Sequence, residues 1–323
     1  FAIVITIVLQ TLFFTVGMQY NKTIINFSAM TVYVGMLIFF FVVLLSDVKI
    51  TTDAFSNIFS LNSFLDVNNL APLLTVAGTI FAYFSILIIS FGDFSRYVKN
   101  EQELKKGNLS LILNLIIFSF LSVFIVIGSD VFLNQKFSDI DRIFTNPTDI
   151  VGKFDNIQIT IVVLFFIIIA SASTNLVANF IPSQYSLINF APSILSLKSA
   201  SYLIAFFGLL IAIFWLTILS QIGILSFVDT FGAFFGPLFG VMAADYYLIK
   251  NQELSNKDLY SIDKESAYYY SGGWHIKGVY SLILGFIFSA STIWNTNLMF
   301  LQSYAWIIGA FVAWMTYYLL AKK

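Results

Sequence analysis

The stretch ITIVVLFFIIIASASTNLVANFI, residues 159–181, is 23 residues long and carries no charged side chain. A helix of about 20 mostly apolar residues crosses the roughly 30 Å hydrocarbon core of a bilayer, so this stretch is predicted to span a membrane. Eight other apolar runs have a similar length. The nine predicted spans cover residues 1–19, 26–46, 71–91, 109–129, 159–181, 200–219, 228–248, 278–296 and 301–321.

The nine runs are continuously apolar and lack the alternation of a membrane barrel, which predicts an all-α polytopic membrane protein. Of the 323 residues, 59% are hydrophobic and 10% charged, whereas about 25% of a soluble domain is charged. The absence of cysteine excludes a disulfide framework and a thiolate metal site. A single histidine leaves little for an imidazole metal cluster or a His-based triad. The net charge of −1 gives no reason to expect a nucleic-acid partner.

The distribution of basic residues predicts the orientation of the spans. Twelve of the 16 Lys and Arg residues fall in one set of alternate connections, which includes the C-terminus, and four fall in the other set. Because basic loops favour the cytoplasmic side, the C-terminus is predicted to be cytoplasmic and residue 1 to lie outside. The chain begins with Phe1 inside an apolar run, so we expect that an odd number of helices precedes it.

The second half of the run 159–181 is the most polar part of any span. At 100° per residue, Ala170, Ser173 and Thr174 share one helix face, and Asn175 and Asn179 lie on the opposite face. A carbonyl and two hydroxyls suit a hard monovalent cation, which prefers oxygen ligands. The amides offer donors and acceptors to a small polar solute. Close helix packing and amide bonds between helices explain the same residues, and both interpretations stay open.

The span 71–91 carries three aromatic residues near its middle, namely Phe81, Tyr83 and Phe84. An aromatic ring at this depth can stack on a planar ligand. Ordinary packing is the alternative, because 18% of the whole chain is aromatic.

The span 228–248 holds Gly232, Gly236 and Gly240 at four-residue spacing, together with Pro237. A stripe of small residues lets two membrane helices approach closely, so the stripe is predicted to be a packing surface. A hinge at the proline is the alternative interpretation.

The charged residues near the spans are predicted to lie at the membrane interfaces. Asp93 and Arg96, at i and i+3, can pair with each other or act as a gate. Asp229 and Asp245 lie at opposite ends of their span, so neither needs to carry a proton, and His275 is expected to be solvated. Because no carboxylate lies in the middle of a span, the sequence favours coupling through a cation held by neutral oxygens.

Four stretches occur together in an order that resembles a known family. They are GDFSRYVKN (92–100), ASASTNLVANFIPSQYSLINFAP (170–192), FGAFFGPLFGVMAADYYLIK (231–250) and DLYSIDKESAYYYSGGW (258–274). The chain resembles the nucleobase:cation symporters of the hydantoin, allantoin, uracil and cytosine permease type. Within that family, STNLVANFIPS is more similar to the hydantoin, allantoin and uracil branch than to the cytosine permeases.

The resemblance implies the leucine-transporter-type inverted-repeat fold of twelve helices, in which the first ten form two five-helix repeats. The first and sixth helices of this fold are broken at the membrane midplane. The nine spans present match family helices four to twelve, so three helices precede them. The implied domains are 1–46, the last two helices of the first repeat; 71–249, the second repeat; and 278–321, two accessory helices.

The resemblance also implies a sodium site on the eighth family helix, in the run 159–181. Its ligands there are the Ala170 carbonyl and the Ser173 and Thr174 hydroxyls. The remaining ligands belong to the first family helix, which precedes residue 1.

The substrate-binding asparagine of the family corresponds to Asn179, with Asn175 as a neighbour. The aromatic that stacks on the substrate corresponds to Phe84, with Tyr83 beside it among the candidate substrate contacts.

We therefore expect a secondary active transporter, not an enzyme, that imports a nucleobase or related ring compound with sodium and needs no other cofactor. Its expected partners are this small ring substrate and the lipid bilayer, and we expect a monomer in the plasma membrane, the bacterial inner membrane. A same-fold transporter of amino acids or another solute, and a proton-coupled cytosine or purine permease, are the alternatives. An integral membrane enzyme would need acidic or histidine clusters at one membrane face, and a channel would not need an aromatic paired with amides.

Overall fold

The computed structural model describes residues 2–15, 18–46, 48–58, 60, 66–136, 157–215, 221, 224–261 and 263–322. These residues form helices joined by turns, and the sole strand-like pairing among them is an isolated bridge between Ser271 and Trp274. Eight of the helical segments are long and apolar enough to cross a membrane. The predicted class, an all-α polytopic membrane protein, is therefore confirmed.

The eight segments coincide with eight of the nine predicted spans. They are Ile25–Leu45, Val67–Ile89, Glu101–Asp130, Thr160–Phe190, Leu197–Phe214, Phe227–Ile249, Ile276–Trp294 and Thr296–Ala321. The prediction 1–19 corresponds to α1, Ala2–Thr15, whose 14 residues are fewer than a span needs. Residues 16 and 17, which belong to that prediction, lie outside the described residues.

The chain forms two compact units, of which the first comprises Phe1–Asp66 and Asp93–Ala212. In the first unit α2 packs against α7 and α9, and the rings of Phe40 and Phe124 lie 4.3 Å apart at the contact of α2 with α7. The elements of the first unit are α1, α2 Met18–Ser46, α3 Val48–Ile58, α7 Glu101–Lys136, α9 Ile157–Asn175, the π-helix η2 Leu176–Phe180, α10 Ile181–Phe190 and most of α11 Leu197–Phe214.

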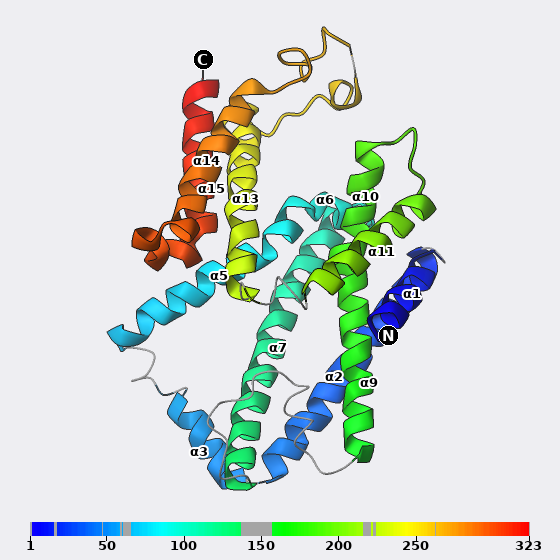
Figure 1. Ribbon diagram of the computed structural model, residues 1–323, viewed down its shortest axis with the longest axis vertical. Helices are drawn as coiled ribbons and strands as arrows, with labels where there is room; N and C mark the ends of the chain where they lie inside the picture. The colour runs from blue at the N-terminus through cyan, green and yellow to red at the C-terminus, as the bar shows by residue number, and fades with distance from the viewer. Residues whose placement is uncertain are drawn as a thin grey trace. The chain divides into compact units, whose positions relative to one another are not determined.

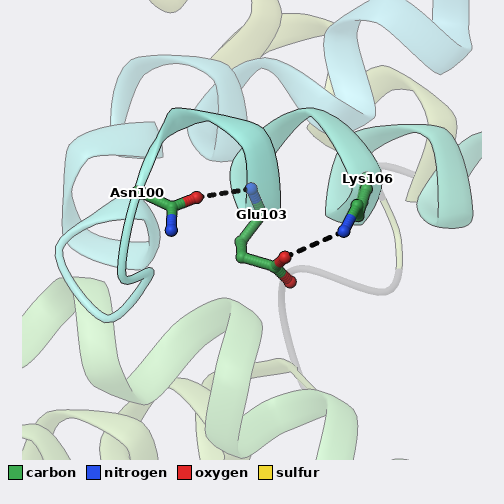
Figure 2. Close-up of polar contacts among 3 residues, drawn as sticks. All are labelled: Asn100, Glu103 and Lys106. Carbon is green, nitrogen blue, oxygen red and sulfur yellow. Dashed lines mark hydrogen bonds and ion pairs between the residues drawn. The ribbon is translucent and has the colours of Figure 1, made fainter.

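The first turn of α7 is stabilised by polar side chains (Figure 2). The Glu103 backbone N–H donates to Asn100 Oδ1 at 2.9 Å, which caps one of the N–H groups that lack a partner within the helix. Glu103 Oε1 also accepts from Lys106 Nζ at 3.0 Å. Acidic residues in the first turn favour helix formation because they face the positive end of the helix dipole. These contacts fix the start of the 36-residue α7.

The second unit comprises Val67–Gly92 and Ile213–Lys323. Its three helices α13, α14 and α15 pack against one another, and α5 packs against α13 (Figure 1). The elements are the 3₁₀ turn η1 Val67–Asn69, α5 Leu70–Ile89, α13 Ile224–Ala244, the π-helix η4 Asp245–Ile249, the 3₁₀ turns η5 Asp258–Tyr260 and η6 Thr296–Tyr304, α14 Ile276–Trp294 and α15 Ala305–Ala321. The short α6, Phe91–Ser95, lies at the boundary of the two units. These two units are groups of residues in mutual contact and not sequence repeats. The repeat boundaries expected from the sequence therefore stay predictions.

The glycine stripe of α13 forms the close contact with α15, which confirms the packing prediction. A Cβ atom at Gly236 would collide with the Trp306 carbonyl, and one at Gly240 would collide with the Ala310 carbonyl. Because no side chain intervenes, the backbones of α13 and α15 approach within van der Waals distance. This small-residue contact is the centre of the second unit.

Candidate functional site

The helix that carries most of the predicted site residues changes its geometry in the middle. Helix α9 continues into the π-helix η2, Leu176–Phe180, and then into α10 (Figure 1). The Ile181 N–H bonds to the Leu176 carbonyl five residues earlier, as in a π-helix. Pro182 follows and has no N–H to donate, which disfavours regular α-helical bonding at this point. π-Helical turns inside α-helices are frequent at functional sites.

The two asparagines of the predicted substrate site lie together on this helix. Asn179 Nδ2 donates to Asn175 Oδ1 at 2.8 Å. Asn175 Nδ2 in turn donates to Gln10 Oε1 of α1 at 2.9 Å. The sequence predicted that the two asparagines share a helix face, but it predicted neither the hydrogen bond between them nor Gln10. The signal of Gln10 is a polar side chain in the middle of an apolar run.

The chain of amide hydrogen bonds determines what Asn179 can offer to a ligand. An asparagine amide has two donor hydrogens and one acceptor oxygen. One Nδ2 hydrogen of Asn179 is used by Asn175. Among the described residues, no other group bonds to the Oδ1 atom or to the second Nδ2 hydrogen, so both can bind a neighbouring group. Asn179 is an exposed residue of the first unit. A donor and an acceptor side by side are complementary to the edge of a cyclic amide or ureide.

The predicted cation ligands lie one turn earlier on the same helix. Ser173 Oγ donates to the Ala170 carbonyl at 3.1 Å, so this hydroxyl and this carbonyl are adjacent in space. Ala170 and Ser173 are half-buried, and Thr174 is exposed. The three groups supply neutral oxygens, which fits the preference of a hard monovalent cation. Their assignment as sodium ligands stays a prediction.

The aromatic residues of α5 divide into two sets. Phe81 stacks on Trp306 with ring centroids 5.5 Å apart, so for Phe81 the packing interpretation is confirmed. Tyr83 and Phe84 contact each other edge to face at 5.2 Å. Tyr83 is 63% exposed, and Phe84 is half-buried. Phe84 belongs to the second unit and Asn179 to the first, so stacking on a substrate bound at Asn179 stays a prediction.

Helix α5 itself runs unbroken over Leu70–Ile89. The break that the resemblance implied near the membrane midplane is therefore absent from this helix, and that expectation is wrong. The helix ends at Ser90 instead. Gly78 would be a candidate position for unwinding, but a Cβ atom there would collide with the Ser303 carbonyl of η6. Close packing, and not a helix break, explains this glycine.

The pair at the start of the GDFSRYVKN stretch forms as predicted. Arg96 Nη2 lies 3.6 Å from Asp93 Oδ1. The Arg96 guanidinium also lies 4.2 Å from the ring centroid of Tyr185 on α10, and the Tyr185 hydroxyl is hydrogen-bonded to the Tyr97 hydroxyl. Burial raises the pKa of the Asp93 carboxyl, and the neighbouring Arg96 opposes this effect. Through Arg96 and Tyr97, the segment before α7 contacts Tyr185 on α10, the helix that follows Asn179.

His275 is half-buried and contacts neighbouring side chains, which differs from the solvated side chain expected from the sequence. Its ring stacks on Tyr270 at 3.9 Å, and its Nε2 lies 2.7 Å from the Tyr317 hydroxyl. The Tyr317 hydroxyl donates to Asp245 Oδ1 at 2.6 Å. Burial lowers the pKa of His275, and the nearby Asp245 carboxylate opposes this effect. The expectation failed because the tyrosine-rich connection folds back onto the ends of α13 and α15.

Asp229 lies near the start of the spanning segment Phe227–Ile249, at the end of the span where the sequence placed it. The sequence did not predict that its side chain is buried, with 2% of its surface exposed. Its Oδ2 atom accepts a hydrogen bond from Gln302 Nε2 of η6 at 3.0 Å. The packing of η6 against α14 and α5 explains why Asp229 is buried. Hydrophobicity along the chain cannot reveal this burial, because it does not show which distant segments come together.

These features define a multi-pass helical membrane protein with amides, hydroxyls and carboxyls inside its spanning segments, as is typical of membrane transporters. The profile of one family, described as "Permease for cytosine/purines, uracil, thiamine, allantoin", matches residues 1–318. The chain belongs to this family, which confirms the resemblance inferred from the four stretches.

Three curated relatives of known name are similar to the chain. The allantoin permease of Bacillus subtilis (strain 168) is 28% identical over 75% of this chain and 48% of its own length. The purine-uracil permease NCS1 of Arabidopsis thaliana is 25% identical over 75% of this chain and 41% of its own length. The putative allantoin permease of Escherichia coli (strain K12) is 26% identical over 77% of this chain and 50% of its own length. The chain thus spans about half the length of the curated relatives it matches.

Among solved structures, the inward-facing conformation of Mhp1 aligns with 91% of this chain and 74% of its own chain. The TM-score is 0.44 and the sequence identity 18%.

Proposed function

We propose that the protein is a secondary active transporter that imports a nucleobase or a related ring compound of the hydantoin, allantoin or uracil class together with sodium. The observation that carries the proposal is the pair Asn175–Asn179 at the π-helical turn of a spanning helix. Membership of a permease family supports the transport activity.

Substrate recognition would use complementary hydrogen bonds. The Asn179 Oδ1 atom accepts from a ring N–H, and its second Nδ2 hydrogen donates to the adjacent ring carbonyl. Phe84 stacks on the ring face, a contact worth about 0.5–1.5 kcal/mol beyond the burial of area. An amino acid, whose charged ends need different partners, fits this arrangement less well.

Sodium would bind at the Ala170 carbonyl and the Ser173 and Thr174 hydroxyls, one turn from the asparagines. The adjacency of Ser173 Oγ and the Ala170 carbonyl supports this assignment. Because cation and substrate would share one helix, binding of the cation stabilises the outward-open state to which the substrate binds. Substrate then favours closure by a movement of one helix bundle against the other.

The proposed membrane and orientation of the chain follow from the distribution of basic residues. Basic residues favour the cytoplasmic side, which supports a cytoplasmic C-terminus in the plasma membrane, here the bacterial inner membrane. We propose a monomer as the transporting species, since all of the proposed ligands come from one chain.

Thermal unfolding of the full-length protein in detergent tests the proposal. Hydantoins, allantoin, uracil, cytosine, purines and amino acids are each added with sodium or with choline. A ligand at 100 times its Kd stabilises the folded state by about 2.7 kcal/mol. We expect the melting temperature to rise with one ring compound, and to rise more in sodium than in choline.

Two variants make the test specific. Asn179→Ala should lose the ring-dependent shift, whereas Asn189→Ala, at the exposed end of the same helical segment, should keep it. A shift caused by amino acids alone would refute the substrate class. Equal shifts in sodium and choline would refute the coupling ion.

A further inference from the structure

The described fold contains a buried acidic side chain that the proposed transport mechanism does not use. Asp229 lies near the start of α13, inside the spanning segment Phe227–Ile249, and 2% of its surface is exposed. Its Oδ2 atom accepts from Gln302 Nε2 at 3.0 Å. Its Oδ1 atom is fully buried and has no hydrogen-bond partner among the described residues. The carboxyl group is therefore half satisfied at a place that water does not reach.

Among the described residues, the helices that pack around Asp229 bring no basic side chain within reach of this carboxylate. The elements that pack against α13 are α5, α14, α15 and η4. Residue Gln302 of η6 reaches α13 through its hydrogen bond to Asp229. In the described residues, α5, α15, η4 and η6 contain no Lys, Arg or His, and α14 contains Lys277 alone. The titratable and charged groups of all these elements are Tyr83, Asp245, Tyr246, Tyr247, Lys277, Tyr280, Tyr304, Tyr317 and Tyr318.

Lys277 lies at the opposite end of the second unit. It follows His275 closely, and His275 contacts Tyr317, which donates to Asp245 at the far end of α13. Asp229 and Asp245 are 16 residues apart, or about 24 Å along the helix. An ion pair between Asp229 and Lys277 is therefore excluded by distance.

An ionised carboxylate in this setting would be strongly unfavourable, because it is removed from water without a counter-ion and with one oxygen unpaired. A bound proton removes the charge and needs only one oxygen. A metal cation, in contrast, needs several oxygen ligands. The Gln302 amide directs its N–H, and not its oxygen, towards Asp229, which is the opposite of what a cation site requires.

We propose that Asp229 is a proton-binding site of this protein: a proton from solvent binds to Oδ1 while the carboxyl is open to water, and it stays bound when the contact between Asp229 and Gln302 is closed. The step forms one O–H bond and breaks one O–H bond of hydronium. The proton returns to water when Gln302 separates from Asp229 and exposes the carboxyl. This site would add a pH dependence to transport that is independent of the cation site proposed at Ala170, Ser173 and Thr174.

Infrared spectroscopy of the full-length protein in lipid vesicles at neutral pH tests the proposal, with the aspartates labelled by carbon-13. We expect an absorption of a protonated carboxyl that shifts with the label. Asp229→Asn, which has the same shape and no charge, should lose this absorption. Asp245→Asn should keep it, because Asp245 accepts a hydrogen bond from Tyr317.

If Asp229→Asn does not fold, the wild-type spectrum can still refute the proposal. The absence of a protonated-carboxyl absorption at neutral pH would overturn the proposal. The absorption would also have to survive the addition of sodium, since its loss on adding sodium would identify a cation site instead. Retention of the full absorption in a folded Asp229→Asn variant would equally overturn it.

Discussion

Replacement of Gln10 by leucine should weaken ligand binding at Asn179 without any contact between Gln10 and the ligand. Gln10 Oε1 accepts from Asn175 Nδ2 at 2.9 Å, and Asn175 Oδ1 accepts from Asn179 Nδ2 at 2.8 Å. Leucine fills a similar volume but accepts no hydrogen bond. In the Gln10→Leu variant the Asn175 amide can rotate, and Asn179 loses its fixed orientation.

The size of the effect follows from the strength of one hydrogen bond between membrane helices. Such bonds contribute about 0.6 kcal/mol on average and up to about 1.7 kcal/mol. Because 1.4 kcal/mol corresponds to a tenfold change in Kd, we expect the affinity for the ring compound to fall by about 3- to 15-fold. Gln10→Glu should bind nearly as tightly as the wild type, since a carboxyl oxygen accepts in either protonation state.

Isothermal titration of the detergent-solubilised full-length protein, with the ring compound that gives the largest thermal shift, measures this difference. Thr11→Val is the matched control, because Thr11 is the next residue of α1 and its hydroxyl bonds to the Ile7 carbonyl of its own helix. Unchanged affinity in Gln10→Leu would refute the positioning role. So would an equal loss in Gln10→Glu, since that variant keeps the acceptor.

The remaining predictions concern the cation, the histidine and the glycine stripe. Thr174→Val should raise the sodium concentration for half-maximal uptake several-fold, and an unaltered sodium dependence of uptake would contradict the site. Because burial lowers the pKa of His275, the folded state favours neutral histidine; its contribution to stability is complete above about pH 6.5 and is lost as the pH falls through the folded-state value. The melting temperature should accordingly fall less on acidification in His275→Gln than in the wild type, and parallel curves would contradict this. Gly240→Ala should lower stability by about 1–3 kcal/mol because of the collision with the Ala310 carbonyl. Gly208→Ala, which has no atom within 4 Å of the added Cβ, should leave stability equal or higher, as thermal unfolding would show.

The helices and the asparagine pair were predictable because both depend on residues that are near in sequence. A run of about 20 apolar residues specifies a span without reference to the rest of the chain. The spacing of Asn175 and Asn179 places them on one face of any helix, whether or not a third residue joins them.

The partners from distant parts of the chain were not predictable in the same way. Gln10 and Asn175 are 165 residues apart, and no local pattern links them. Asp229 was expected near a membrane interface because it lies at the end of an apolar run, and His275 was expected to be solvated because it lies in a polar connection. The burial of Asp229 depends on η6, and that of His275 depends on the tyrosine-rich connection. Hydropathy along the sequence does not describe how these two segments fold.

The π-helical turn Leu176–Phe180 has a consequence for the comparison of related sequences. A π turn accommodates one residue more than an α-helical turn, so the helix after it is rotated by about 100° relative to a regular helix. Tyr185 therefore contacts Arg96 from a direction that a helical wheel drawn from Ala170 would assign to another side. A relative that lacks one residue between Asn175 and Pro182 would have a regular helix, and its residues equivalent to Tyr185 would face a different neighbour.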